Sequence, residues 1–184
     1  MIKYPLRILG LFLLMSCANH TLDQDFNCSG YKIISKQKTV RDFNNKFSIV
    51  IPQHWKTSLY DEEGLSSLLV ADTTISLQNS ILMDISFLNN STPIDSKFSD
   101  KISSDNKKMG FKEVKTKRFT IDDSPAYYTL AKGKKGAYPY TILNIFHKPS
   151  KEALLHSKVE IYGDSLVDER ICKSVQLIKK IKTL

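Results

Sequence analysis

The amino-acid sequence predicts an α+β fold in which an antiparallel β-sheet is flanked by helices. Two observations support this fold class. Most apolar segments are short, alternate in polarity and follow one another at hairpin-like spacing, as antiparallel strands do. Only two segments have helical periodicity, and one lies between strands whereas the other ends the chain.

The strongest strand pattern is Phe47–Ile51, in which Phe47, Ile49 and Ile51 share one face before Pro52 ends the hydrogen bonding. Trp55, the only tryptophan, is expected to close one end of the core. The glycines of Lys132–Gly136 predict a hairpin turn. The other expected strands cover residues 31–36, 66–71, 81–88, 112–121, 126–131, 138–147 and 156–162.

Two helices are expected. The first begins near Thr92-Pro93, where a capping hydroxyl, a proline and the carboxylate of Asp95 favour a helix start, and it ends at Gly110. The second begins near Asp164 or Ser165 and carries lysines at its carboxyl end. Its apolar stripe consists of Leu166, Ile171, Val175 and Ile178.

The chain begins with the three parts of a secretory signal. Lys3 and Arg7 precede an apolar stretch over residues 8–15, which is shorter than the roughly 20 residues of a membrane-spanning helix. Leu14-Met15-Ser16-Cys17 resembles the bacterial lipobox. This resemblance implies removal of residues 1–16 and acylation of Cys17, which anchors the chain in a membrane. The alternative is an ordinary signal peptide with a chance cysteine.

The leader sets the expected organisation and location. We expect a signal peptide over 1–16, a lipidated polar tether over 17–29 and a single domain over 30–184. The protein then faces the periplasm of a bacterial envelope, and Ala18 after the acylated cysteine slightly favours the outer over the inner membrane. Cys28 and Cys172 are the remaining cysteines, and an oxidising compartment favours a disulfide between them; two free thiols are the alternative.

The net charge of +8 indicates which classes of partner the protein can attract. About six positive charges remain once Lys3 and Arg7 are removed, and such an excess attracts acidic lipids, glycans or proteins. The lysines are scattered and no nucleic-acid-binding motif accompanies them, so no nucleic-acid partner is expected.

Three stretches resemble one known superfamily. They are FSIVIPQHW over residues 47–55, DSPAYYTL over 123–130 and ICKSVQLI over 171–178. Together they resemble the Mog1/PsbP-like superfamily, which includes DcrB-like lipoproteins, although Asp123-Ser124 stands where that family often has glycine. The resemblance implies an αβα sandwich and a non-enzymatic role as an assembly factor, adaptor or binding module.

No residue pattern predicts catalysis. His54, His147 and His156 are separated, and neither a hydrolase motif nor a metal-ligand spacing surrounds them. The acidic run Asp61–Glu63 is interpreted as a solvated turn. We therefore expect no enzyme activity, no cofactor and no metal. A hydrolase is the less favoured hypothesis, and it requires the histidines to converge in one cleft.

The aromatic residues of the predicted hairpin suggest a binding surface. Because neighbouring strand residues face opposite ways, one of Tyr127 and Tyr128 is expected in the core and the other outside. The candidate partner-binding residues are Tyr138, Tyr140, Lys132, Lys134 and Lys135. Simple cross-strand packing is the alternative reading. The function expected is a lipid-anchored accessory module that binds another envelope protein; an immunity-type protein that binds one cognate toxin is the narrower alternative.

Overall fold

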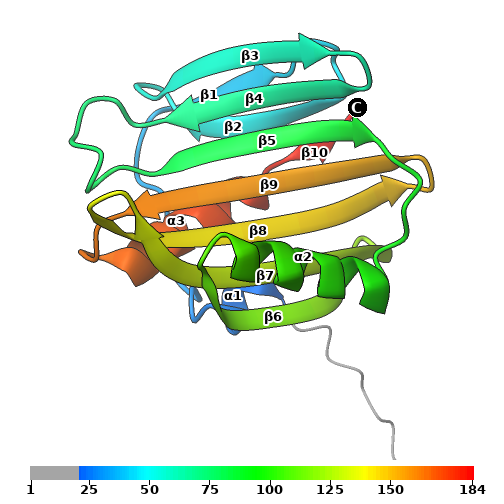
Figure 1. Ribbon diagram of the computed structural model, residues 1–184. Helices are drawn as coiled ribbons and strands as arrows, with labels where there is room; N and C mark the ends of the chain where they lie inside the picture. The colour runs from blue at the N-terminus through cyan, green and yellow to red at the C-terminus, as the bar shows by residue number, and fades with distance from the viewer. Residues whose placement is uncertain (1–20) are drawn as a thin grey trace, which may run out of the picture.

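The computed structural model describes residues 21–184, which form two antiparallel β-sheets and three helices (Figure 1). The larger sheet has the strand order β3-β4-β5-β9-β8-β7-β6, and the smaller sheet has the order β1-β2-β10. The predicted α+β class, with an antiparallel sheet flanked by helices, is confirmed.

The elements follow one another in a simple order. The strands of the large sheet are β3 (Lys56–Glu62), β4 (Leu65–Ala71), β5 (Leu82–Asn89), β6 (Lys112–Ile121), β7 (Ser124–Lys135), β8 (Tyr138–Ser150) and β9 (Ala153–Tyr162). The small sheet contains β1 (Gln37–Arg41), β2 (Phe47–Pro52) and β10 (Lys182–Thr183). The helices are α1 (Leu22–Asp25), α2 (Ser96–Lys108) and α3 (Val167–Ile178).

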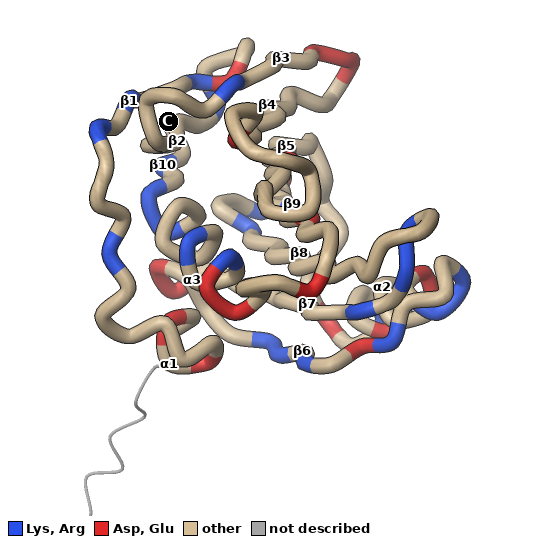
Figure 2. Tube along the Cα trace, turned by 90° about the vertical axis from the view of Figure 1, so that its left-hand side faces the viewer, with Lys and Arg blue, Asp and Glu red and all other residues tan. Residues whose placement is uncertain are grey.

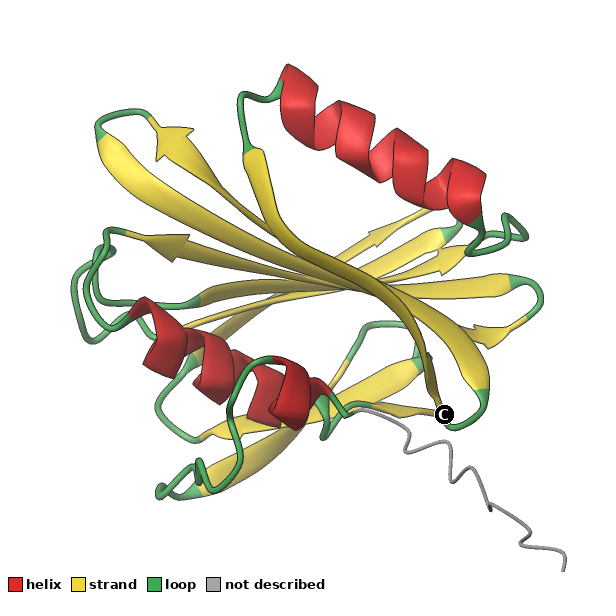
Figure 3. Cartoon of the chain, turned by 90° about the horizontal axis from the view of Figure 1, so that it is seen from below, coloured by secondary structure: helices red, strands yellow, loops and turns green. Residues whose placement is uncertain are grey.

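The main core lies between the two sheets. One face of the large sheet packs against β2, α3 and α1, and Trp55 is buried in this core as the sequence predicts. Side chains alternate along each strand, so the opposite face of the large sheet is a separate surface. Helix α2 covers part of that face (Figure 3). Phe98 and Ile102 of the helix and Ile94 just before it pack on Tyr127, Phe146 and Leu154.

Several local expectations are corrected. Residues 31–36 form no strand, because the first strand begins at Gln37, where pairing with β2 starts. Helix α2 begins at Ser96, since the Asp95 carboxylate accepts a hydrogen bond from the Phe98 amide and is the actual cap. Helix α3 begins only at Val167, after Leu166 in a left-handed conformation. Tyr127 and Tyr128 are both buried, because α2 covers the face on which Tyr127 lies.

The two glycines of the predicted hairpin turn have different roles. Strands β7 and β8 remain paired out to Lys135 and Tyr138, so the turn is only Gly136-Ala137, with Gly136 at φ 62°. Gly133 lies within β7, and a Cβ atom there would stand 2.5 Å from the ring of Phe111. Gly133 therefore makes room for the segment that joins α2 to β6.

No helix in residues 21–184 is long and apolar enough to cross a membrane. The expected leader over 1–16 and the lipid-attachment residue Cys17 lie outside the described residues.

Candidate functional site

The two cysteines of the described chain are joined. Cys28 and Cys172 form a disulfide with their Cα atoms 5.1 Å apart, as expected from the sequence. The bond ties the segment after α1 to helix α3. It links residues 144 positions apart, so it closes most of the folded chain into one loop.

The segment before Cys28 is part of the folded domain, whereas the sequence suggests a tether over 17–29. Leu22 is buried in the main core. Asp25 pairs with Lys117 of β6 at 2.9 Å, and Asp23 pairs with Lys179 at the end of α3. These contacts hold α1 against both β6 and α3, so residues 22–28 belong to the folded domain.

The hairpin of β7 and β8 carries the predicted partner-binding residues, but its register divides them. Tyr140 is only 3% exposed, and its hydroxyl donates a hydrogen bond to Glu160. Lys135 pairs with the same carboxylate at 2.7 Å and lies over the rings of Tyr140 and Tyr162. Tyr140 is thus buried in the domain, and Lys135, although exposed, is held by an ion pair, whereas Tyr138, Lys132 and Lys134 are exposed and belong to no ion pair of the described residues.

Electrostatics of the Glu160 cluster follow from these contacts. Burial opposes ionisation of Glu160, but the hydrogen bonds from Lys135 and Tyr140 outweigh it and lower the pKa of the carboxyl group. The bond to Glu160 raises the pKa of Lys135, and burial together with Glu160 raises the pKa of Tyr140. The cluster is a closed ion pair rather than a reactive site.

The exposed lysines of the hairpin meet others from α2 and β6. Lys112 and Lys132 lie directly opposite each other in the β6–β7 ladder. Contact between Phe111 and Gly133 brings the end of α2 beside them. We call Lys107, Lys108, Lys112, Lys132 and Lys134 the lysine tip; basic residues gather in this region in Figure 2. Met109 (56% exposed), which follows α2, and Tyr138 (37% exposed), the first residue of β8, are exposed apolar side chains of the neighbouring segments.

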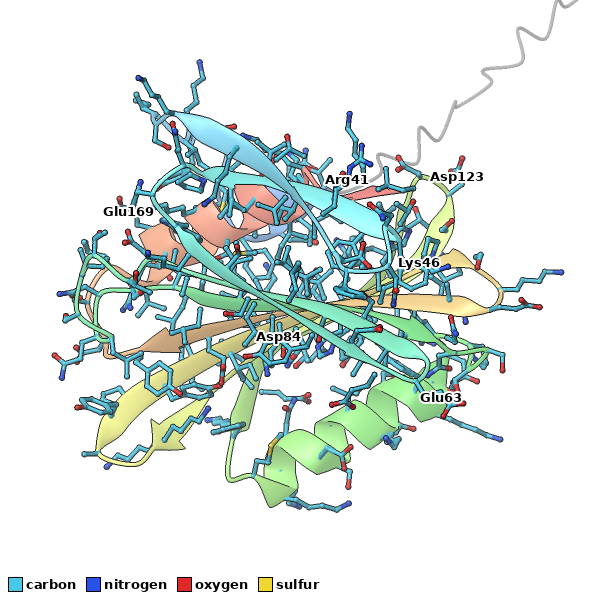
Figure 4. All side chains as sticks on the ribbon, turned by 90° about the horizontal axis from the view of Figure 1, so that it is seen from above. Arg41, Lys46, Glu63, Asp84, Asp123 and Glu169 are labelled. Atoms are coloured by element: carbon cyan, nitrogen blue, oxygen red, sulfur yellow. A yellow bond between two sulfur atoms is a disulfide. The ribbon has the colours of Figure 1, made fainter. Side chains whose placement is uncertain are left out.

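The three histidines do not converge. His54 lies 3.3 Å from Asp72 near Trp55, whereas His156 lies 2.9 Å from Asn144 on the α2 side of the large sheet. His147 is on the opposite side of that sheet, where it faces the main core. Within the described residues, no group of three or more His, Cys, Asp or Glu side chains is placed to hold a metal ion. The acidic residues Asp61–Glu63 are exposed at the β3–β4 turn, where Figure 4 labels Glu63.

An apolar pocket lies between the two sheets, a feature that no local sequence pattern indicates. Its volume is about 600 Å³. We call it the inter-sheet pocket. It is lined by Thr21, Leu22, Phe119, Thr120, Ile121, Asp122, Ile145, His147, Leu155, Ser157, Ile178, Lys179, Ile181, Lys182 and Thr183.

Solved structures with a similar fold are found for most of the chain. CyanoP, the PsbP protein of the cyanobacterium Synechocystis, has a TM-score of 0.57 over 85% of this chain and 97% of its own, at 10% identity. This chain has a PsbP/Mog1-like fold. The Saccharomyces cerevisiae Ran-binding protein Mog1p has a TM-score of 0.54 over 81% of this chain and 96% of its own, at 10% identity.

A third similar structure is a protein of Bacteroides thetaiotaomicron, with a TM-score of 0.50, 15% identity, and coverage of 83% of this chain and 49% of that one. No protein-family model matches the sequence, and comparison with curated proteins gives no match. At these identities the likeness establishes the PsbP/Mog1-like fold alone.

Proposed function

We propose that the protein is a membrane-anchored envelope lipoprotein that serves as a non-enzymatic accessory module, and that the lysine tip binds an acidic surface of another envelope protein. The lipobox-like residues that end in Cys17 support the anchor. The Cys28–Cys172 disulfide supports an oxidising compartment such as the periplasm. Mog1p, which shares the fold, is described as Ran-binding, so this architecture is compatible with a protein-binding role.

The observation that carries the binding role is the arrangement of charge at the lysine tip. Like charges directly opposite one another on neighbouring strands are destabilising, yet Lys112 and Lys132 occupy such a pair. Within residues 21–184, no ion pair compensates Lys107, Lys112, Lys132 or Lys134. An acidic partner removes this repulsion, and the exposed Met109, which follows α2, and Tyr138, at the hairpin turn, offer apolar contacts on the neighbouring segments.

Site-specific photo-crosslinking tests the proposed partner surface. A photoreactive benzoylphenylalanine in place of Tyr138 is expected to capture a defined membrane-associated protein in cells, whereas the same group in place of Ile34 (95% exposed) is not. The double variant Lys132→Glu/Lys134→Glu is expected to abolish this product. Lys32→Glu/Lys36→Glu is the matched control, because both residues are exposed in the loop that precedes β1.

Equal crosslinking from both positions, or no effect of charge reversal, would contradict the proposed surface. One product identified as a secreted toxin would assign the protein to the immunity class instead. Intact-mass analysis with Cys17→Ala beside the wild type tests the anchor separately, and an unmodified Cys17 would overturn it. Membrane fractionation of the same cells decides between the outer membrane, which we favour, and the inner.

A further inference from the structure

The inter-sheet pocket opens at one end of the molecule, beside the first described residue. Its mouth is formed by Thr21, by Asp122 in the β6–β7 turn and by Lys182 and Thr183 of β10. Strand β10 pairs with β2 over only two residues, so the small sheet is narrow at this end. Figure 4 places Lys46, whose carbonyl accepts a bond from the Leu184 amide, and Asp123 at this same end.

The interior of the pocket is apolar on both sides. Phe119, Ile145 and Leu155 of the large sheet form one wall, and Leu22, Ile178 and Ile181 form the other. A volume of about 600 Å³ lies within the range of about 300 to 1,000 Å³ that is typical of small-molecule sites, which are apolar with a few polar groups. The walls therefore fit an aliphatic chain rather than a polar metabolite.

One polar atom stands unpaired among these walls. Within the described chain, Nε2 of His147 is buried and has no hydrogen-bond partner. Such atoms are rare in native proteins and call for a partner, because a lost hydrogen bond is costly in an apolar environment. Burial also lowers the pKa of His147, despite the opposing effects of Asp122 and the Ile121 backbone, so the ring is neutral at pH 7. A neutral imidazole nitrogen can bond to one polar atom of a ligand.

The charges at the mouth favour an acidic head group. Lys182 is exposed and has no ion-pair partner among residues 21–184. Lys179 stands next to it and is paired with Asp23. Asp122 is the acidic residue of the lining, and Lys182 is the lysine of the lining that is left to hold an acidic head group.

We propose that the inter-sheet pocket binds a single-chain fatty acid, with the alkyl chain between the two sheets and the carboxylate held by Lys182 and by the unpaired Nε2 of His147. Nothing in the proposed accessory function requires this second site. Only the source of the ligand rests on the proposed anchor: Cys17 lies four residues before Thr21, so a lipidated Cys17 keeps the mouth within about 14 Å of the membrane surface. The fatty acid then enters from the membrane.

Photo-labelling of the full-length protein in phosphatidylcholine vesicles tests this proposal. The probe is palmitic acid with a diazirine in its chain and a terminal alkyne, and the labelled peptides are located by mass spectrometry. Labelling is expected in the peptides that contain Phe119 and Ile178.

Three isoleucine-to-tryptophan variants distinguish binding in the inter-sheet pocket from binding elsewhere. Ile181→Trp fills the inter-sheet pocket, Ile75→Trp fills a smaller pocket beside Trp55, and Ile34→Trp lies in neither.

Only Ile181→Trp is expected to lower the labelling, by about fivefold or more, because the chain loses its apolar contacts. Thr183→Trp, at the exposed rim, serves as the second blocking variant if Ile181→Trp does not fold, as judged by thermal unfolding. Lys182→Met is expected to weaken labelling by the acid but not by the corresponding fatty alcohol.

Equal labelling of all the tryptophan variants, or labelling by a diacyl phospholipid probe in preference to the acid, would overturn the proposal. A Cys17→Ala variant that binds the acid when it is added directly, but no longer acquires it from vesicles, would support the anchor as the route of entry. A variant that acquires the acid from vesicles as well as the wild type does would refute that route and leave the pocket in place.

Discussion

Helices α2 and α3 lie on opposite faces of the same sheet and are held there in different ways (Figure 3). Helix α3 lies beside the small sheet on one face of the large sheet and has seven buried residues. Helix α2 has a single buried residue, Asn106, and packs on the outer face through a few partly buried apolar side chains.

The two helices show that an amphipathic pattern predicts a helix but not how deeply that helix is buried. Beneath α2 the contacts are partly polar, since Asn106 and Thr129 both donate hydrogen bonds to the Glu113 carboxylate. Helix α3 is fixed by apolar burial and by the disulfide to the segment after α1. We therefore expect α2 to be the layer that opens first, and α3 to open only with the whole domain.

Removal of the disulfide has the largest expected effect. Cys28→Ala/Cys172→Ala should lower the free energy of unfolding by about 3 to 5 kcal/mol, because the unfolded chain regains the freedom of a long loop. Urea unfolding measures the loss. Hydrogen exchange is expected to show faster exchange in α1 and α3 and unchanged exchange in α2. An equal rise in the exchange rate in all three helices would contradict this prediction, because the disulfide would then stabilise the whole domain and not α1 and α3 in particular.

Paired alanine substitutions compare the two helices directly. Ile171→Ala, in the enclosed core, is expected to cost about 4 kcal/mol, whereas Phe98→Ala, on the outer face, is expected to cost about 2 kcal/mol. Phe98 loses edge-to-face contacts with Tyr127 and Phe146 but is already partly exposed. Urea unfolding of both variants gives the two values, and equal costs would refute the difference in burial.

Much of the fold could be predicted because alternation of polar and apolar residues is a local signal. It located β2 and the strands from β4 to β9, and it placed both long helices. Strand β3 was missed because Lys56–Glu62 is exposed along most of its length and shows no clear alternation. Helix α1 was missed because one turn carries no periodicity. The division into two sheets depends on pairing between distant segments, which no single segment encodes.

The candidate site could be predicted only in part. Composition identified Lys132, Lys134 and Tyr138 as candidate surface residues, but the β8–β9 register turns Tyr140 toward Glu160 and buries it. The Cys28–Cys172 pairing followed from counting cysteines. The inter-sheet pocket could not be foreseen, since its walls come from segments far apart in the sequence that meet only after the two sheets pack.

The outer face carries a pH-sensitive residue, which offers a test of how α2 responds to acid. His156 stacks on Phe146, the ring on which Phe98 of α2 packs. Burial lowers the pKa of His156 from 6.5 to about 4, although Asp84 opposes the shift.

Because the unfolded histidine binds a proton more readily than the folded one, the stability that it contributes is lost as the pH falls from 6.5 towards 4. The expected loss is about 2 to 3 kcal/mol. Urea unfolding between pH 7 and pH 4 measures it. His156→Phe preserves the stacking and is expected to flatten this part of the pH profile. An unchanged slope in the variant would show that carboxylates alone account for the acid sensitivity.

The smallest expected effect concerns the start of α2. The Asp95 carboxylate accepts the amide hydrogen of Phe98 at 2.9 Å, and Asp95→Ala removes this cap at a cost of about 1 kcal/mol. If α2 opens separately from the rest of the domain, the loss of this cap lowers the free energy of opening α2 and leaves the free energy of global unfolding unchanged. Amide exchange within α2 then rises by about fivefold while the urea midpoint hardly moves.

Asp100→Ala, on the exposed surface of the same helix, is the control and should change neither quantity. A shift of the urea midpoint by the full 1 kcal/mol without faster exchange in α2 would mean that α2 unfolds only together with α3, and the two helices would then differ in burial but not in cooperativity.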